Sequence, residues 1–125
     1  FYVLDSMNLR VQIFDRAGRF LYKFGALGDS TGNFARPRSI ALDLDGNIYV
    51  VDALFNAVQI FDKKGRLLLV FGRGGDMGGQ FTLPAGIYID GADNKIYVAD
   101  SYNSRVQVFR YIKSSQLSNN AQQKR

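Results

Sequence analysis

The chain has 125 residues, with 16 basic and 11 acidic side chains and neither cysteine nor histidine. These residues therefore form no disulfide, no thiolate or histidine-ligated zinc site and no histidine-based catalytic triad. Glutamate is also absent, and the remaining aspartate, lysine, arginine and tyrosine side chains titrate far from neutral pH. The composition thus disfavours general acid–base catalysis, and we expect no cofactor and no catalytic residue in this chain.

The net charge of +5 raises the question of a nucleic-acid partner. Three basic side chains lie near the end of the chain, at Lys113, Lys124 and Arg125, so residues 1–111 hold 13 basic and 11 acidic groups. That balance is typical of an ordinary protein surface, whereas a phosphate backbone favours a contiguous basic face with stacking aromatic groups. Charge therefore supports nucleic-acid binding only weakly. No run of apolar residues is long enough to span a bilayer.

Residues 1–25 begin with the strand-like segment Phe1-Tyr2-Val3 and continue through a hairpin at Arg16–Arg19 to Gly25. Residues 37–72 carry four strand-like segments rich in β-branched and aromatic residues. These segments are 39–42, 48–51, 57–61 and 66–71. Turns at Asp43–Asn47 and Asp62–Gly65 separate them, and Gly65 supplies the positive φ of a tight hairpin. Four antiparallel strands in a unit of this length predict one blade of a β-propeller.

The same unit recurs along the chain. Phe34 and Phe81 are 47 residues apart, as are Gly25 and Gly72, and the third copy continues over residues 84–111. A repeat of this period with strand-like segments and no amphipathic helical pattern predicts a β-propeller. A sandwich seldom repeats its sequence, and a β-helix has much shorter rungs.

Several segments carry a family resemblance. Residues 84–90, 94–101 and 103–109, with the closing Phe71-Gly72, resemble the NHL repeat. The resemblance covers residues 1 to about 111 and implies an all-β, NHL-type propeller with four-stranded antiparallel blades. Members of this family form six-bladed rings. Here about two and a half blades are expected, over residues 1–25, 37–72 and 84–111.

Strand counting suggests the C-terminal part of a longer propeller. The first blade lacks an innermost strand and the last lacks an outermost one, so we expect the remaining blades to come from the same or another chain. Alone, the two terminal blades would present apolar faces, and we do not expect a stable monomer. Residues 112–125 are polar and are expected to form a tail or linker.

An aspartate ends the second strand of each unit, at Asp5, Asp52 and Asp100. One carboxylate per blade at the same loop position does not converge on a metal ion. We expect structural roles instead, with Asp5 paired to Arg10 and Asp100 to Arg105 across the turn. The middle unit departs from this pattern, because Phe55 and Ala57 stand where its neighbours have asparagine and arginine.

The loops between second and third strands, together with the connectors between blades, emerge on one side of a propeller. We expect this side to recognise a protein or peptide, because exposed aromatic side chains flanked by arginine are typical of binding hot spots. The candidate binding residues are Met7, Asn8, Arg36, Arg38, Leu54, Phe55, Arg73, Tyr102 and Asn103.

Three functions are compatible with the resemblance. The favoured one is a non-catalytic binding scaffold. The first alternative is an RNA-binding NHL propeller, which needs a contiguous basic and aromatic face. The second is part of an enzyme similar to the peptidyl-hydroxyglycine lyases, whose NHL-like ring holds zinc through histidines that this chain does not supply. The resemblance favours an exported bacterial protein, with a cytoplasmic protein as the alternative.

Overall fold

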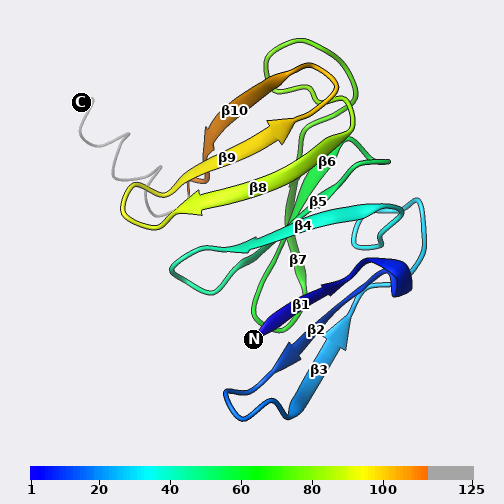
Figure 1. The fold of residues 1–125 in the computed structure, drawn as a ribbon, viewed down its shortest axis with the longest axis vertical. Helices are drawn as coiled ribbons and strands as arrows, with labels where there is room; N and C mark the ends of the chain where they lie inside the picture. The colour runs from blue at the N-terminus through cyan, green and yellow to red at the C-terminus, as the bar shows by residue number, and fades with distance from the viewer. Residues whose placement is uncertain (113–125) are drawn as a thin grey trace.

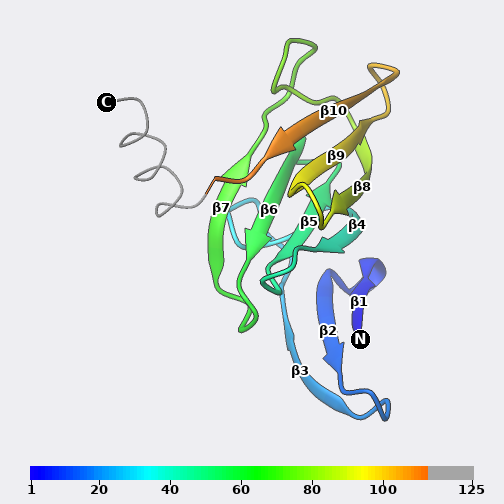
Figure 2. The ribbon, with the colours of Figure 1, turned by 90° about the vertical axis from the view of Figure 1, so that its left-hand side faces the viewer.

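The computed structural model describes residues 1–112, and the proposed tail lies outside them apart from its first residue. The described residues form three antiparallel sheets that fan out from one side of the molecule (Figures 1 and 2). The sheets contain three, four and three strands in chain order, as strand counting predicted. The only helical element of residues 1–112 is a single 3-10 turn, so the all-β propeller prediction is confirmed.

Each sheet is a meander of consecutive strands. The first blade contains β1 (Tyr2–Asp5), the 3-10 turn η1 (Ser6–Asn8), β2 (Arg10–Phe14) and β3 (Phe20–Phe24). The middle blade contains β4 (Pro37–Leu42), β5 (Ile48–Asp52), β6 (Ala57–Phe61) and β7 (Leu67–Phe71). The third blade contains β8 (Pro84–Asp90), β9 (Lys95–Asp100) and β10 (Arg105–Arg110).

The two central strands of the middle blade, β5 and β6, are buried on both faces because a neighbouring blade covers each one. In β5, Ile48 and Val50 face the first blade and share a core with its Val11 and Ile13; Phe34 of the connector and Phe61 of β6 complete this core. Tyr49 and Val51 point to the opposite face and pack with Ile96 and Val98 of the third blade. The period of two residues along a strand thus places one half of β5 in each of two separate cores.

Two phenylalanines close the cores where one blade is connected to the next. Phe34 and Phe81 are fully buried, and their rings contact Phe61 and Phe109, respectively. The two residues occupy the same position in the repeat, 47 residues apart. Gly25 and Gly72 have positive φ, and a Cβ at either would meet the phenylalanine ring, so both conformation and space require glycine. Phe14, at the end of β2, is only half-buried and contacts Phe20.

Candidate binding site on the loop face

One side of the molecule carries the β1–β2, β5–β6 and β9–β10 loops, and β4 and β8 begin there. We call this side the loop face; it comprises residues 6–9, 53–56 and 101–104 with the connectors 25–36 and 72–83. Figure 1 shows the β1–β2 and β9–β10 loops at its right-hand edge. The last residue of each loop, Leu9, Asn56 or Ser104, has a φ between 52° and 57°. All three loops therefore end with a residue in the left-handed backbone conformation, although the three side chains differ.

In the first blade, three side chains donate hydrogen bonds to the loop aspartate. Asp5 Oδ2 accepts hydrogen bonds from Asn8 Nδ2 at 2.9 Å, Arg10 Nε at 3.0 Å and Gln12 Nε2 at 3.2 Å. The hydrogen bonds from Asn8 and Arg10 lower the pKa of the Asp5 carboxyl below its ordinary value. Asp5 and Arg10 thus form the ion pair expected from their spacing.

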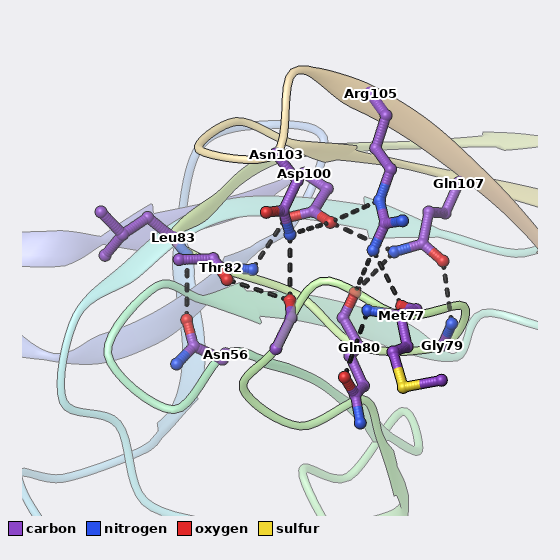
Figure 3. Close-up of polar contacts among 11 residues, drawn as sticks. Asn56, Met77, Gly79, Gln80, Thr82, Leu83, Asp100, Asn103, Arg105 and Gln107 are labelled. Carbon is purple, nitrogen blue, oxygen red and sulfur yellow. Dashed lines mark hydrogen bonds and ion pairs between the residues drawn. The ribbon is translucent and has the colours of Figure 1, made fainter.

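The third blade repeats this network around a fully buried aspartate (Figure 3). Asp100 Oδ2 accepts from Asn103 at 2.9 Å, Arg105 Nε at 2.9 Å and Gln107 at 3.2 Å, while Oδ1 accepts the Thr82 N–H at 2.8 Å. Burial raises the pKa of the Asp100 carboxyl, but the hydrogen bonds from Thr82 and the three side chains outweigh it, so the pKa lies below its ordinary value.

Arg105 and Gln107 also fasten the connector that precedes this blade. Arg105 Nη2 donates to the carbonyl oxygens of Met77 and Gln80, at 2.8 and 2.9 Å. The Gln107 amide donates to the Gln80 carbonyl at 2.7 Å and accepts the Gly79 N–H at 3.0 Å. One hydrogen-bond network therefore connects β10, the β9–β10 loop and the connector 72–83.

The middle blade builds the same loop with backbone donors. The carboxylate of Asp52 is fully buried and accepts the N–H groups of Ala35, Arg36, Leu54 and Phe55 at 2.8 to 3.2 Å. None of the ion pairs among the described residues involves Asp52. Substitution of arginine by Ala57 has thus removed the cation, and four backbone dipoles stabilise the buried charge in its place.

The predicted binding residues separate into two groups. Asn8 and Asn103 donate to the loop aspartates, and Asn103 also donates to the Gly75 carbonyl, so both are engaged within the fold. The other residues are available at the surface. Met7, Leu54 and Tyr102, which occupy the same loop position in the three blades, are 93%, 62% and 72% exposed. Phe55 is half-buried.

The three predicted arginines are exposed, and within the described residues their side chains form no ion pair. They lie in two separate pockets rather than in one. Arg36 and Arg38 line a pocket of about 430 Å³ beside Met7. Arg73 and Phe55 line another, of about 240 Å³.

Sequence reasoning missed part of the second pocket, which Asp29, Thr31 and Gln59 also line. Gln59 carried a signal, because glutamine recurs at the same position in Gln12 and Gln107. Asp29 and Thr31 carried none, since they lie in a glycine-rich connector whose path depends on the packing of two blades.

Among residues 1–112, no group of three carboxylates lies close enough to hold a metal ion. In the same residues, no helix has the length and apolar character needed to cross a membrane.

Comparisons with known families agree with this architecture. Residues 81–109 match the NHL repeat, and residues 1–53 match a domain described as a 6-bladed beta-propeller. No curated protein matches the chain significantly.

Among solved structures, a functionally unknown protein from Desulfotomaculum acetoxidans is 23% identical, with a TM-score of 0.60 over 89% of this chain and 33% of its own. A streptogramin B lyase is 14% identical, with a TM-score of 0.61 over 91% of this chain and 38% of its own. Hydrazine synthase from Kuenenia stuttgartiensis is 19% identical, with a TM-score of 0.59 over 91% of this chain and 32% of its own.

The chain spans about a third of the length of these structures. At such identities the likeness concerns the fold, and enzymes occur among the similar folds. The family matches and the antiparallel blades lead to one conclusion: residues 81–109 match an NHL repeat, and the described residues fold as blades of a β-propeller.

Proposed function

We propose that this chain is part of a non-catalytic binding scaffold whose loop face recognises a protein or peptide. The observation that supports it best is the recurrence of a large, exposed apolar side chain at one loop position in all three blades, at Met7, Leu54 and Tyr102. A single exposed apolar side chain is normal on a protein surface, but three at equivalent positions on one side of a ring form a repeated contact surface.

The charged groups around these side chains support the same proposal. Arg36, Arg38 and Arg73 are exposed, and no carboxylate among residues 1–112 forms an ion pair with them. Arginine beside large apolar groups is enriched in protein interfaces, because its guanidinium stacks on aromatic rings and pairs with carboxylates. A partner with an apolar segment and acidic side chains would match this surface.

A catalytic role finds less support in this chain. The sequence lacks histidine, cysteine and glutamate, and the aspartates at the loop positions are occupied by hydrogen bonds within the fold. The similarity to lyase structures is a similarity of fold and brings no site residues with it.

The test is a double substitution, Phe55→Ala with Arg38→Ala, in the full-length protein. Binding to a partner identified by cross-linking in its native cells should weaken by roughly 2 kcal/mol or more, measured by calorimetry. Lys64→Ala with Arg16→Ala, in the exposed hairpins, is the matched control and should retain the affinity. Thermal unfolding of both variants separates lost contacts from lost folding.

Unchanged affinity in the double variant would refute the proposed loop-face interaction, as would a loss that follows the unfolded fraction. A loss confined to RNA and graded with salt concentration would instead assign the face to nucleic acid, because phosphate contacts release counterions.

A further inference from the structure

The 240 Å³ pocket of the middle blade lies where the other two blades carry an internal arginine. We propose that this pocket accepts the guanidinium group of an arginine side chain from a partner peptide. The inference rests on the proposed binding function of the loop face and specifies one element of what that face recognises.

The third blade shows what a guanidinium does at this position (Figure 3). Arg105 lies between the loop aspartate and the preceding connector, with Nε on Asp100 and Nη2 on two backbone carbonyl oxygens. Its side chain is 31% exposed, so the group lies close to the surface of the blade. A planar cation with several N–H donors fits this arrangement of one carboxylate and two carbonyl groups.

The middle blade keeps the surroundings of this group and lacks the group itself. Ala57 aligns with Arg105, and Ser30 and Asn33 align with Met77 and Gln80. Gln59 still accepts the Gly32 N–H at 2.6 Å and donates to the Asn33 carbonyl at 2.8 Å, just as Gln107 holds the other connector. The connector is therefore held in a corresponding way while Ala57 contributes only a methyl group.

Carbonyl acceptors remain beside this position. The Ser30 carbonyl accepts one hydrogen bond, from the Asn33 N–H, and the Asn33 carbonyl accepts one from Gln59. A carbonyl oxygen has two lone pairs, so each can accept a second donor. The corresponding oxygens of the third blade use that capacity for Arg105.

The lining of the pocket favours a planar cation. Phe55 provides an aromatic ring, and the exposed carboxylate of Asp29 forms no ion pair within the described residues. Asp52 adds a buried negative charge with no cationic partner in that part of the chain. Arg73 also lies in the lining and opposes a cation, whereas Asp52 is fully buried and is not a lining residue, so Asp29 is the carboxylate that a bound cation would meet. Guanidinium stacks on aromatic rings and pairs with carboxylates, which distinguishes it from an ammonium group.

The experiment uses Nα-acetyl-L-arginine amide as the probe and backbone amide NMR of the purified protein as the readout. We expect the probe at millimolar concentrations to shift the resonances of Gly32, Gly74 and the Gln59 side-chain amide. The citrulline analogue has nearly the same shape without the charge and should bind at least tenfold more weakly. The lysine analogue should also bind more weakly, because it lacks the planar fork.

Substitutions at the pocket provide the second arm. Ala57→Arg should abolish the shifts by filling the pocket from within, whereas Ala92→Arg adds the same charge in an exposed turn and should leave them unchanged. Asp29 is exposed, so Asp29→Asn leaves the core intact and keeps the test valid if Ala57→Arg fails to fold. The Asp29→Asn variant should bind the arginine probe at least threefold more weakly. Arg73→Ala should strengthen binding of the probe.

Equal binding of the arginine and citrulline analogues, or full binding to Asp29→Asn, would refute the guanidinium site. So would the absence of shifts. These outcomes are distinct from those of the partner-binding test, because the loop face could bind a partner that contributes no arginine here, and the probe titration involves no partner.

Discussion

The β5–β6 loop and the β9–β10 loop have nearly the same backbone but different internal hydrogen bonds. In the third blade the aspartate is held by asparagine, arginine and glutamine side chains, and the same arginine and glutamine fasten the connector. In the middle blade four backbone N–H groups surround Asp52, two of them from the connector residues Ala35 and Arg36, and Gln59 also fastens the connector. The loop thus keeps its backbone geometry where Ala57 replaces the arginine of the other blades, and the space that the arginine side chain would fill remains open.

This comparison predicts that both connectors depend equally on their buried phenylalanines. Phe81→Ala and Phe34→Ala should each lower the free energy of unfolding by about 3–5 kcal/mol, because each ring fills the space between two blades and a cavity would remain. Urea unfolding of the two variants measures the effect. As a control, Phe20→Ala removes a half-exposed ring and should cost much less. If Phe34→Ala lowered the free energy of unfolding only slightly while Phe81→Ala lowered it by the expected amount, other contacts would hold the first connector.

The second prediction concerns the arginine itself. Arg105→Ala should destabilise the protein by about 2 kcal/mol, because it leaves the buried Asp100 without a cation and removes two hydrogen bonds to the connector. Its matched control is Arg10→Ala. Asp5 is partly exposed and Arg10 reaches no connector in this chain, so that loss should be below about 1 kcal/mol.

Thermal and urea unfolding of the two arginine variants give the comparison. Equal losses of stability in Arg105→Ala and Arg10→Ala would show that neither the burial of Asp100 nor the hydrogen bonds to the connector makes Arg105 more important than Arg10. A loss at Arg105 that vanishes when Asp100 is also replaced by asparagine would show that the ion pair carries the whole effect.

The third and smallest effect is in the pH dependence. Asp100 has a pKa below its ordinary value of 3.8, so its contribution to stability is fully present above that value and is lost as the pH falls through the folded-state pKa. The stability of the Asp100→Asn variant should therefore depend less on pH below about 3.8, although the variant is less stable at neutral pH. Acid titrations followed by circular dichroism measure the two slopes.

Asp93→Asn, in an exposed turn of the same blade, is the control for the pH experiment and should follow the wild-type protein. If Asp100→Asn retains the full wild-type pH dependence, the network around Asp100 does not couple its ionisation to folding.

The sequence by itself determined the strand order, the repeat and the structural partners of Asp5 and Asp100. These features depend on short-range relations: alternation along a strand, glycine at a turn, and an arginine five residues after an aspartate that folds back across one loop. The absence of an equivalent arginine at Ala57 was also visible from the repeat, and it drew attention to the middle loop.

Only the tertiary structure decided how the loop face is divided. Met7, Arg36 and Arg38 lie in one pocket and Phe55 and Arg73 in another, because the connectors pass between the loops. Two of the four backbone donors of Asp52, the N–H groups of Ala35 and Arg36, and the Met77 carbonyl that Arg105 contacts come from segments 16 to 28 residues away. Such contacts depend on how neighbouring blades pack, and the side chains in a single repeat do not specify them.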